Sequence, residues 1–211
     1  MKAAIFDMDG TLLDSMHMWN KLLPMFLNEY NIEADEKFMA DTHSLSLDQM
    51  VPYVVERYSL PISEEELRSH WKDVLSKCYK EEVVPKDGIA ELLESLKAHG
   101  FKTCVATLTD HQLCDKALKD HGLYKYFDHV LTTEDVNMVG KEQPDLFLKC
   151  ASLMGSEPSE TVVFEDSLYP VLPAKKAGFK VCIIEEPVMA AKKEQLMALS
   201  DKYIKSFVEL L

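Results

Sequence analysis

The stretch that decides the fold is Ala3-Ala4-Ile5-Phe6-Asp7-Met8-Asp9-Gly10-Thr11. A short apolar run, residues 3–6, is followed at once by two acids that flank a methionine. Such a run predicts a buried strand that ends at Asp7, because Gly10 then breaks the pattern. Two carboxylates at the end of a buried strand indicate a functional site more than a packing role.

The chain beyond about residue 83 alternates between short apolar runs and amphipathic segments. Strands are predicted at 103–106, 130–131, 161–164, 180–184 and 203–204. The helices predicted between them cover 89–99, about 109–122 and 144–154, and a further helix ends at Gly178. Alternation of this kind predicts an α/β fold, with a Rossmann-like parallel sheet and helices on both faces.

Residues 15–82 follow a different pattern, with helical periodicity and no predicted strand. Capping boxes begin at Ser46 and Ser63, and each opens an amphipathic segment. A third capping box is predicted at Thr109-Asp110-His111-Gln112 in the second part of the chain. We therefore expect an α/β core made of residues 1–14 and 83–211, with an inserted α-helical cap at 15–82.

Composition limits the classes of partner. The 211 residues carry a formal net charge of −13, which argues against nucleic acid or an anionic membrane as the main partner. No apolar run is long enough to span a bilayer, and the five scattered cysteines lack the spacing of a zinc site. We expect a cytoplasmic monomer, and the acidic balance does not exclude a small phosphorylated metabolite as its partner, because a cation and a lysine can reverse the potential in a pocket.

Polar residues follow the other predicted strands as well. Thr107 and Leu108 follow the strand at 103–106, Lys141 lies in the loop after 130–131, and Glu165-Asp166 follow 161–164. Because ligands of an open parallel sheet bind outside the carboxyl ends of its strands, these residues should converge with Asp7 and Asp9.

The chemistry that such a set supports is phosphoryl transfer. A carboxylate such as Asp7 can attack phosphorus, and a second carboxylate, Asp9, can move the proton. Asp166 offers the hard oxygen that Mg²⁺ prefers. Thr107 and Leu108 are placed to bind the phosphoryl group, and Lys141 to balance its charge.

The motifs Asp7-x-Asp9-Gly10-Thr11, Thr107, Lys141 and Glu165-Asp166 resemble those of the haloacid dehalogenase-like superfamily. The resemblance is to its beta-phosphoglucomutase-like phosphatase branch, which carries a helical cap. It implies Asp7 as nucleophile and Asp9 as general acid and base. It also implies Mg²⁺ held by Asp7, the Asp9 carbonyl and Asp166, supported by Thr11 and Glu165, and a sugar phosphate as substrate.

Some positions depart from that pattern and leave alternatives open. Trp19 and Leu47 stand where a mutase of this branch has a histidine and an arginine, which favours a phosphatase. A phosphosugar mutase and an inorganic pyrophosphatase remain alternatives. Glu142 beside Lys141, and the two prolines after Ser167, Pro170 and Pro173, keep open a non-catalytic binding protein and predict a helix that begins late. Candidate substrate contacts from the cap are His17, Trp19 and His43.

Overall fold

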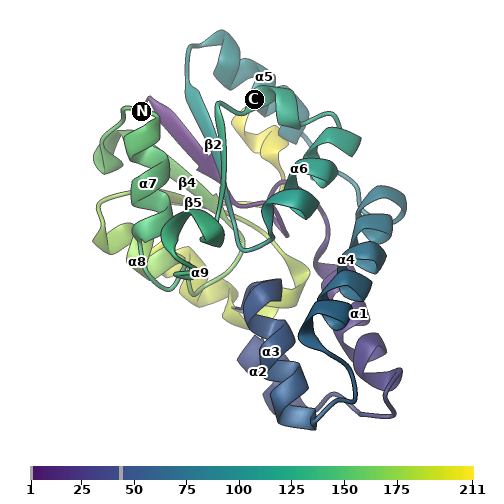
Figure 1. Ribbon diagram of the computed structural model, residues 1–211. Helices are drawn as coiled ribbons and strands as arrows, with labels where there is room; N and C mark the ends of the chain where they lie inside the picture. The colour runs from purple at the N-terminus through teal and green to yellow at the C-terminus, as the bar shows by residue number, and fades with distance from the viewer. Residues whose placement is uncertain (1, 43–44) are drawn as a thin grey trace.

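The computed structural model describes residues 2–42 and 45–211. Within these residues a single parallel sheet has the order β3-β2-β1-β4-β5-β6 (Figure 1). Its strands are β1 (Ala3–Phe6), β2 (Lys102–Thr107), β3 (His129–Thr132), β4 (Thr161–Glu165), β5 (Lys180–Ile184) and β6 (Lys202–Ile204). The predicted α/β fold is confirmed, and β1 lies at the centre of the sheet, where the direction of strand addition reverses.

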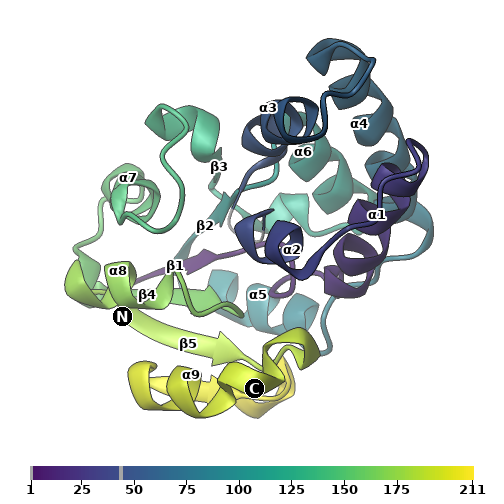
Figure 2. The same ribbon diagram turned by 90° about the horizontal axis from the view of Figure 1, so that it is seen from below.

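Helices cover both faces of this sheet (Figure 2). Ala4 and Phe6 of β1 belong to an apolar cluster with α5 (Ile89–Ala98) and α6 (His111–Asp120). Ala3 and Ile5 point into a second cluster, shared with α7 (Asp145–Leu153), α8 (Val171–Lys176) and α9 (Lys193–Leu199). Short 3₁₀ turns complete this part of the chain: η1 (Tyr124–Tyr126), η2 (Thr133–Val136), η3 (Pro158–Glu160), η4 (Pro187–Lys192) and η5 (Phe207–Leu210).

The segment between β1 and α5 is helical and is called the helical insert below. It contains α1 (Met16–Asn28), α2 (Glu36–Thr42), α3 (Leu47–Tyr58) and α4 (Glu64–Glu81), which lie together beyond the carboxyl ends of the strands (Figure 1). The capping boxes predicted at Ser46 and Ser63 are present. Helix α2 was not predicted. None of the described helices is both long and apolar enough to cross a membrane.

Two short chain segments connect the helical insert to the sheet, and they pair with each other. The amide of Asp14 donates to the carbonyl of Val84 at 2.8 Å, and the amide of Lys86 donates to that of Leu12 at 2.9 Å. The chain therefore leaves and re-enters the α/β part at one place, which suits a hinge. The division into a core (1–14 and 83–211) and a movable cap (15–82) stays a prediction.

The third predicted capping box is wrong in its register. Asp110, not Thr109, is the N-cap of α6, and its carboxylate accepts from the amides of Gln112 and Leu113. A carboxylate competes well for these amides, so the helix begins one residue later than expected. Helix α8 begins at Val171, as the two prolines predicted.

The aromatic centre of the helical insert gives a test of its packing. The rings of Phe26 in α1 and Trp71 in α4 stack with centroids 4.7 Å apart, and both side chains are buried. Phe26→Ala should lower the free energy of unfolding by about 3–5 kcal/mol, measured by urea denaturation. Met25→Ala is the matched control, because its side chain is 38% exposed, and it should stay within about 0.5 kcal/mol of the parent. Equal effects of the two changes would contradict this packing.

Candidate active site

The ends of β1 and β4 are held next to each other just before the acids begin. Phe6 and Phe164 are paired in the sheet, and their rings stack with centroids 4.5 Å apart and an interplanar angle of 4°. The amide of Asp7 then donates to the carbonyl of Phe164 at 3.0 Å. This pairing fixes Asp7, the residue after β1, beside Glu165 at the end of β4.

Three buried carboxylates meet at this point. Carboxylate oxygens of Asp7, Glu165 and Asp166 all lie within 4.8 Å of one another. Lys141 is buried with them: its Nζ contacts Asp7 Oδ1 and donates to Glu165 Oε1 at 2.8 Å. Four of the residues predicted from three different strand ends are therefore brought together.

Burial controls the protonation of this cluster. Desolvation raises the pKa of Asp7 to about 8, although the nearby Lys141 ammonium acts to lower it. Desolvation, with the charges of Asp7 and Glu165, also raises the pKa of Asp166 well above its usual range. Burial alone would lower the pKa of Lys141, but Asp7 and Glu165 outweigh it and raise that pKa. Lys141 therefore stays positively charged, while the raised pKa values of Asp7 and Asp166 disfavour the state in which both are ionised.

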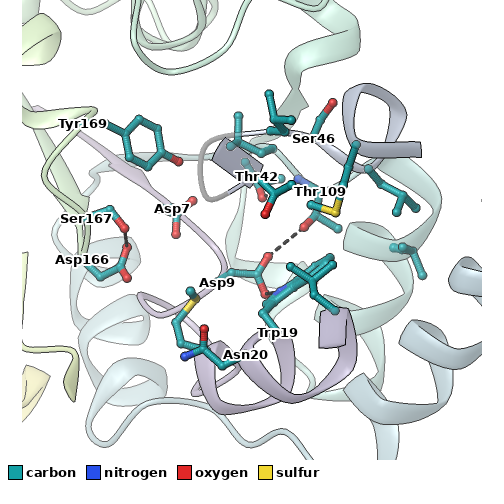
Figure 3. Close-up of a pocket in the computed structure, with 18 of the residues that line it drawn as sticks. Asp7, Asp9, Trp19, Asn20, Thr42, Ser46, Thr109, Asp166, Ser167 and Tyr169 are labelled. Carbon is teal, nitrogen blue, oxygen red and sulfur yellow. Dashed lines mark hydrogen bonds between the residues drawn. The ribbon is translucent and has the colours of Figure 1, made fainter. Parts of the chain in front are cut away.

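Asp9 lies outside this cluster and has its own set of partners. Its Oδ1 accepts from Ser15 Oγ at 2.6 Å, Trp19 Nε1 at 3.2 Å and the Tyr79 hydroxyl at 2.7 Å. Its Oδ2 accepts from Thr109 Oγ1 at 2.8 Å, a bond visible in Figure 3. Tyr79 is buried, and both desolvation and the Asp9 charge raise its pKa, so it stays a donor. All four donors are neutral groups.

Gly10 is required where it stands. Its φ is 79°, in the left-handed region, and a Cβ there would lie 2.4 Å from Asp166 Oδ2. A side chain would meet both backbone strain and the carboxylate. The glycine of the motif therefore lets the turn after β1 approach Asp166 closely.

A pocket opens above these residues (Figure 3). Asp7 lies between Asp9 on one side and Asp166 with Ser167 on the other, while Trp19 and Asn20 face Thr42 and Ser46 across the space. The predicted phosphate-binding residues Thr107 and Leu108 line it too.

The other residues that the sequence analysis singled out differ in where they lie relative to this pocket. Trp19 lines the pocket, whereas His17 is exposed and is not part of the lining. His43 lies outside the described residues. The Thr107 hydroxyl accepts from the Thr109 amide at 3.1 Å, and the Thr11 hydroxyl is buried without a hydrogen-bond partner. Glu142 is exposed, and its carboxylate lies over Gly140.

Three partners of Asp9 were missed in the sequence: Ser15, Tyr79 and Thr109. Thr109 was assigned to a helix cap that Asp110 in fact provides. Tyr79 lies 70 residues from Asp9, in a helix whose apolar spacing explains a buried tyrosine without any functional role. Ser15 alone left a usable signal, since a hydroxyl shortly after an acidic turn can bond back to it.

The carboxylates also fit a divalent cation. Asp166 Oδ2 is buried and has no hydrogen-bond partner, although buried carboxylate oxygens are normally paired. The cluster offers hard oxygen ligands, the kind that Mg²⁺ takes. Asp7 and Asp166 would hold such an ion, Asp166 through its unpartnered Oδ2 and Asp7 through the oxygen that does not contact Lys141.

Comparison with known proteins agrees with this arrangement. The model of the haloacid dehalogenase-like hydrolase family matches residues 4–184. The chain belongs to this family. A probable pseudouridine-5'-phosphatase of Drosophila melanogaster is 30% identical over 197 residues, which cover 90% of this chain and 84% of that protein. The resemblance seen in the motifs is therefore confirmed at the level of the family.

Other relatives of this hydrolase point the same way. A phosphorylated carbohydrates phosphatase of Thermotoga maritima is 27% identical over 180 residues, covering 85% of this chain and 83% of that protein. The crystal structure of CbbY from Rhodobacter sphaeroides in complex with phosphate superposes with a TM-score of 0.85. At 20% identity, with 100% of this chain and 96% of that chain covered, the latter similarity concerns the fold.

We expect this cluster to bind Mg²⁺ in a pH-dependent way, because burial raises the pKa of Asp7 and Asp166. Because Asp7 holds a proton up to about pH 8, the ion must displace it at lower pH. The apparent Kd for Mg²⁺ should therefore fall as pH rises from 6 to 8, by up to about tenfold per unit for one displaced proton. Isothermal titration calorimetry in buffers of different pH measures this.

Two variants, one in the cluster and one outside it, serve as the test and the control for this measurement of Mg²⁺ binding. Asp166→Asn should weaken Mg²⁺ binding at every pH, whereas Asp14→Asn should not, because Asp14 is half exposed and pairs with Lys86 instead. A Kd that stays constant between pH 6 and 8 in the parent protein would contradict the argument.

Proposed function

We propose that this hydrolase is a Mg²⁺-dependent phosphatase that cleaves a small phosphate monoester through an aspartyl-phosphate on Asp7. The observation that carries the proposal is the buried contact between Asp7 and Lys141 at the end of β1, with Glu165 and Asp166 within reach. A carboxylate held by a buried ammonium at the floor of a pocket suits attack on a phosphoryl group. The names of the matched relatives, which include phosphatases, support the same reaction class.

The proposed reaction divides between the two acids. An oxygen of Asp7 attacks phosphorus, and the bond from phosphorus to the leaving oxygen breaks while Asp9 gives that oxygen a proton. Asp9 then takes a proton from water, which attacks the aspartyl-phosphate and releases inorganic phosphate. Lys141 holds Asp7 in place and offsets the charge of the phosphoryl group. Bound Mg²⁺ supplies further positive charge for the phosphoryl oxygens.

The hydrogen bonds of Asp9 indicate which of its two carboxylate oxygens carries the proton that is transferred in the proposed reaction. Oδ1 already accepts three hydrogen bonds, from Ser15, Trp19 and Tyr79. Oδ2 has the single partner Thr109, whose hydroxyl can accept as readily as it donates. We therefore assign the mobile proton to Oδ2, with Thr109 reversing its bond when Asp9 is protonated.

Substitution of the two acids tests the mechanism. Asp7→Ala should abolish phosphate release from p-nitrophenyl phosphate, and Asp9→Asn should slow it and let phosphoenzyme accumulate. EDTA should stop the reaction, and Mg²⁺ should restore it. Asp14→Asn is the matched control, an acid of the same loop that lies outside the pocket lining, and should keep parental activity. Full activity in Asp7→Ala would refute the covalent mechanism.

The Tyr79–Asp9 hydrogen bond gives a finer test. Tyr79→Phe keeps the buried ring and removes one donor from Asp9 Oδ1, so Asp9 is held less firmly. A hydrogen bond to a charged group contributes about 1.5–3 kcal/mol. Loss of a bond of this strength from the transition state should lower kcat about tenfold. KM should change little, because Tyr79 does not line the pocket. Tyr124→Phe, at a site 37% exposed, is the control. A change in KM alone would assign Tyr79 to substrate binding instead.

A further inference from the structure

The side of the pocket that faces the phosphate site is formed by the helical insert and is mainly apolar. This surface, called the roof below, contains Met16, Trp19 and Leu23 from α1 and, from α2 to α3, Met39, Leu45 and Met50. The opposite surface, the floor, contains the carboxylates described above. Because the phosphoryl group belongs at the floor, the leaving group of the ester must contact the roof.

The described lining of this pocket offers no cationic side chain to a second anionic group on the substrate. Asp7, Asp9, Asp110, Glu165 and Asp166 line it, whereas no described lining residue is lysine or arginine.

The cations that lie near the pocket are already paired. Lys141 contacts Asp7 and Glu165, and Lys72 Nζ lies 3.2 Å from Asp110 Oδ1. A second phosphate or a carboxylate on the leaving group would therefore lose its hydration without gaining a counter-charge.

Several polar atoms of the roof already take part in hydrogen bonds within the protein. The Thr42 hydroxyl donates to the Phe38 carbonyl at 2.8 Å, and the Ser46 hydroxyl accepts from the Gln49 amide at 3.3 Å. The indole N–H of Trp19 donates to Asp9. A polyhydroxylated leaving group would bury several hydroxyls against methionine and leucine side chains, which is unfavourable when they lack partners.

We propose that the leaving group of the natural substrate is uncharged and mainly apolar, an aromatic or aliphatic ring that packs against Trp19 and the methionines. Aromatic faces and flexible thioethers suit such a ring. Asn20, at the exposed edge of the pocket, supplies the polar contact for a substituent. The inference rests on the proposed phosphatase function and narrows its substrate away from sugar phosphates and bisphosphates.

A matched pair of substrates tests this directly. Cyclohexylmethyl phosphate and glucose 6-phosphate both place a six-membered ring on a primary alkyl phosphate, so their chemical reactivity is similar. The parent protein with Mg²⁺ should show a kcat/KM at least about tenfold higher for cyclohexylmethyl phosphate, mostly through KM. An equal or higher value for glucose 6-phosphate would overturn the inference and leave the phosphatase function standing. No phosphate release from either ester or from p-nitrophenyl phosphate would instead refute the function.

A charge placed in the roof gives the converse test. Met39 is half-buried in the lining, so Met39→Lys should lower the KM for fructose 1,6-bisphosphate about tenfold and raise that for cyclohexylmethyl phosphate. Met25→Lys, on an exposed part of α1, adds the same charge outside the pocket and should change neither KM. A parent protein that already prefers the bisphosphate would contradict the proposal whatever the variants do.

Discussion

Three carboxylates buried around one lysine impose the constraint on which the rest of this protein depends. Asp7, Glu165 and Asp166 are each less than a tenth exposed, and Lys141 balances only one of their charges. Such a cluster is stable only if protons or a cation supply the remaining charge. The parallel pairing of β1 with β4 forces these acids together, and Gly10 lets the chain pass Asp166 without a clash. The features that make the site costly to fold are therefore those on which the proposed binding of a cation and a phosphoryl group rests.

Asp9 follows Asp7 by two residues, yet its surroundings differ. Among the described residues no lysine contacts it; hydroxyl groups and an indole do. These neutral donors hold both carboxylate oxygens of Asp9 in place, whereas Asp7 is held by an ammonium. The two acids thus receive distinct environments from one turn, as the proposed division of roles between nucleophile and proton carrier requires.

The sequence predicted the buried cluster at the strand ends better than it predicted the partners of Asp9. Asp7, Lys141 and Asp166 follow from strand ends, because the carboxyl ends of parallel strands meet at one edge of the sheet. Tyr79 and Thr109 reach Asp9 only through the docking of α4 and the exact start of α6, and local patterns do not encode such docking. Helix α2 was missed because its seven residues are too few for a clear period.

The helical insert contacts both Asp9 and the loop that precedes Lys141. Tyr79 and Trp19 bring it to Asp9, while Gln49 Nε2 donates to the Met138 carbonyl at 3.2 Å, shortly before Lys141. Asn137 and Met138 both have positive φ, so this loop has a defined shape that the contact from α3 can stabilise. The same helices form the roof that is proposed to meet the leaving group. In the proposed reaction, a substrate that fits the roof would favour the arrangement in which Asp9 and Lys141 are both held, so that recognition of the leaving group and positioning of the proton carrier would depend on the same helices.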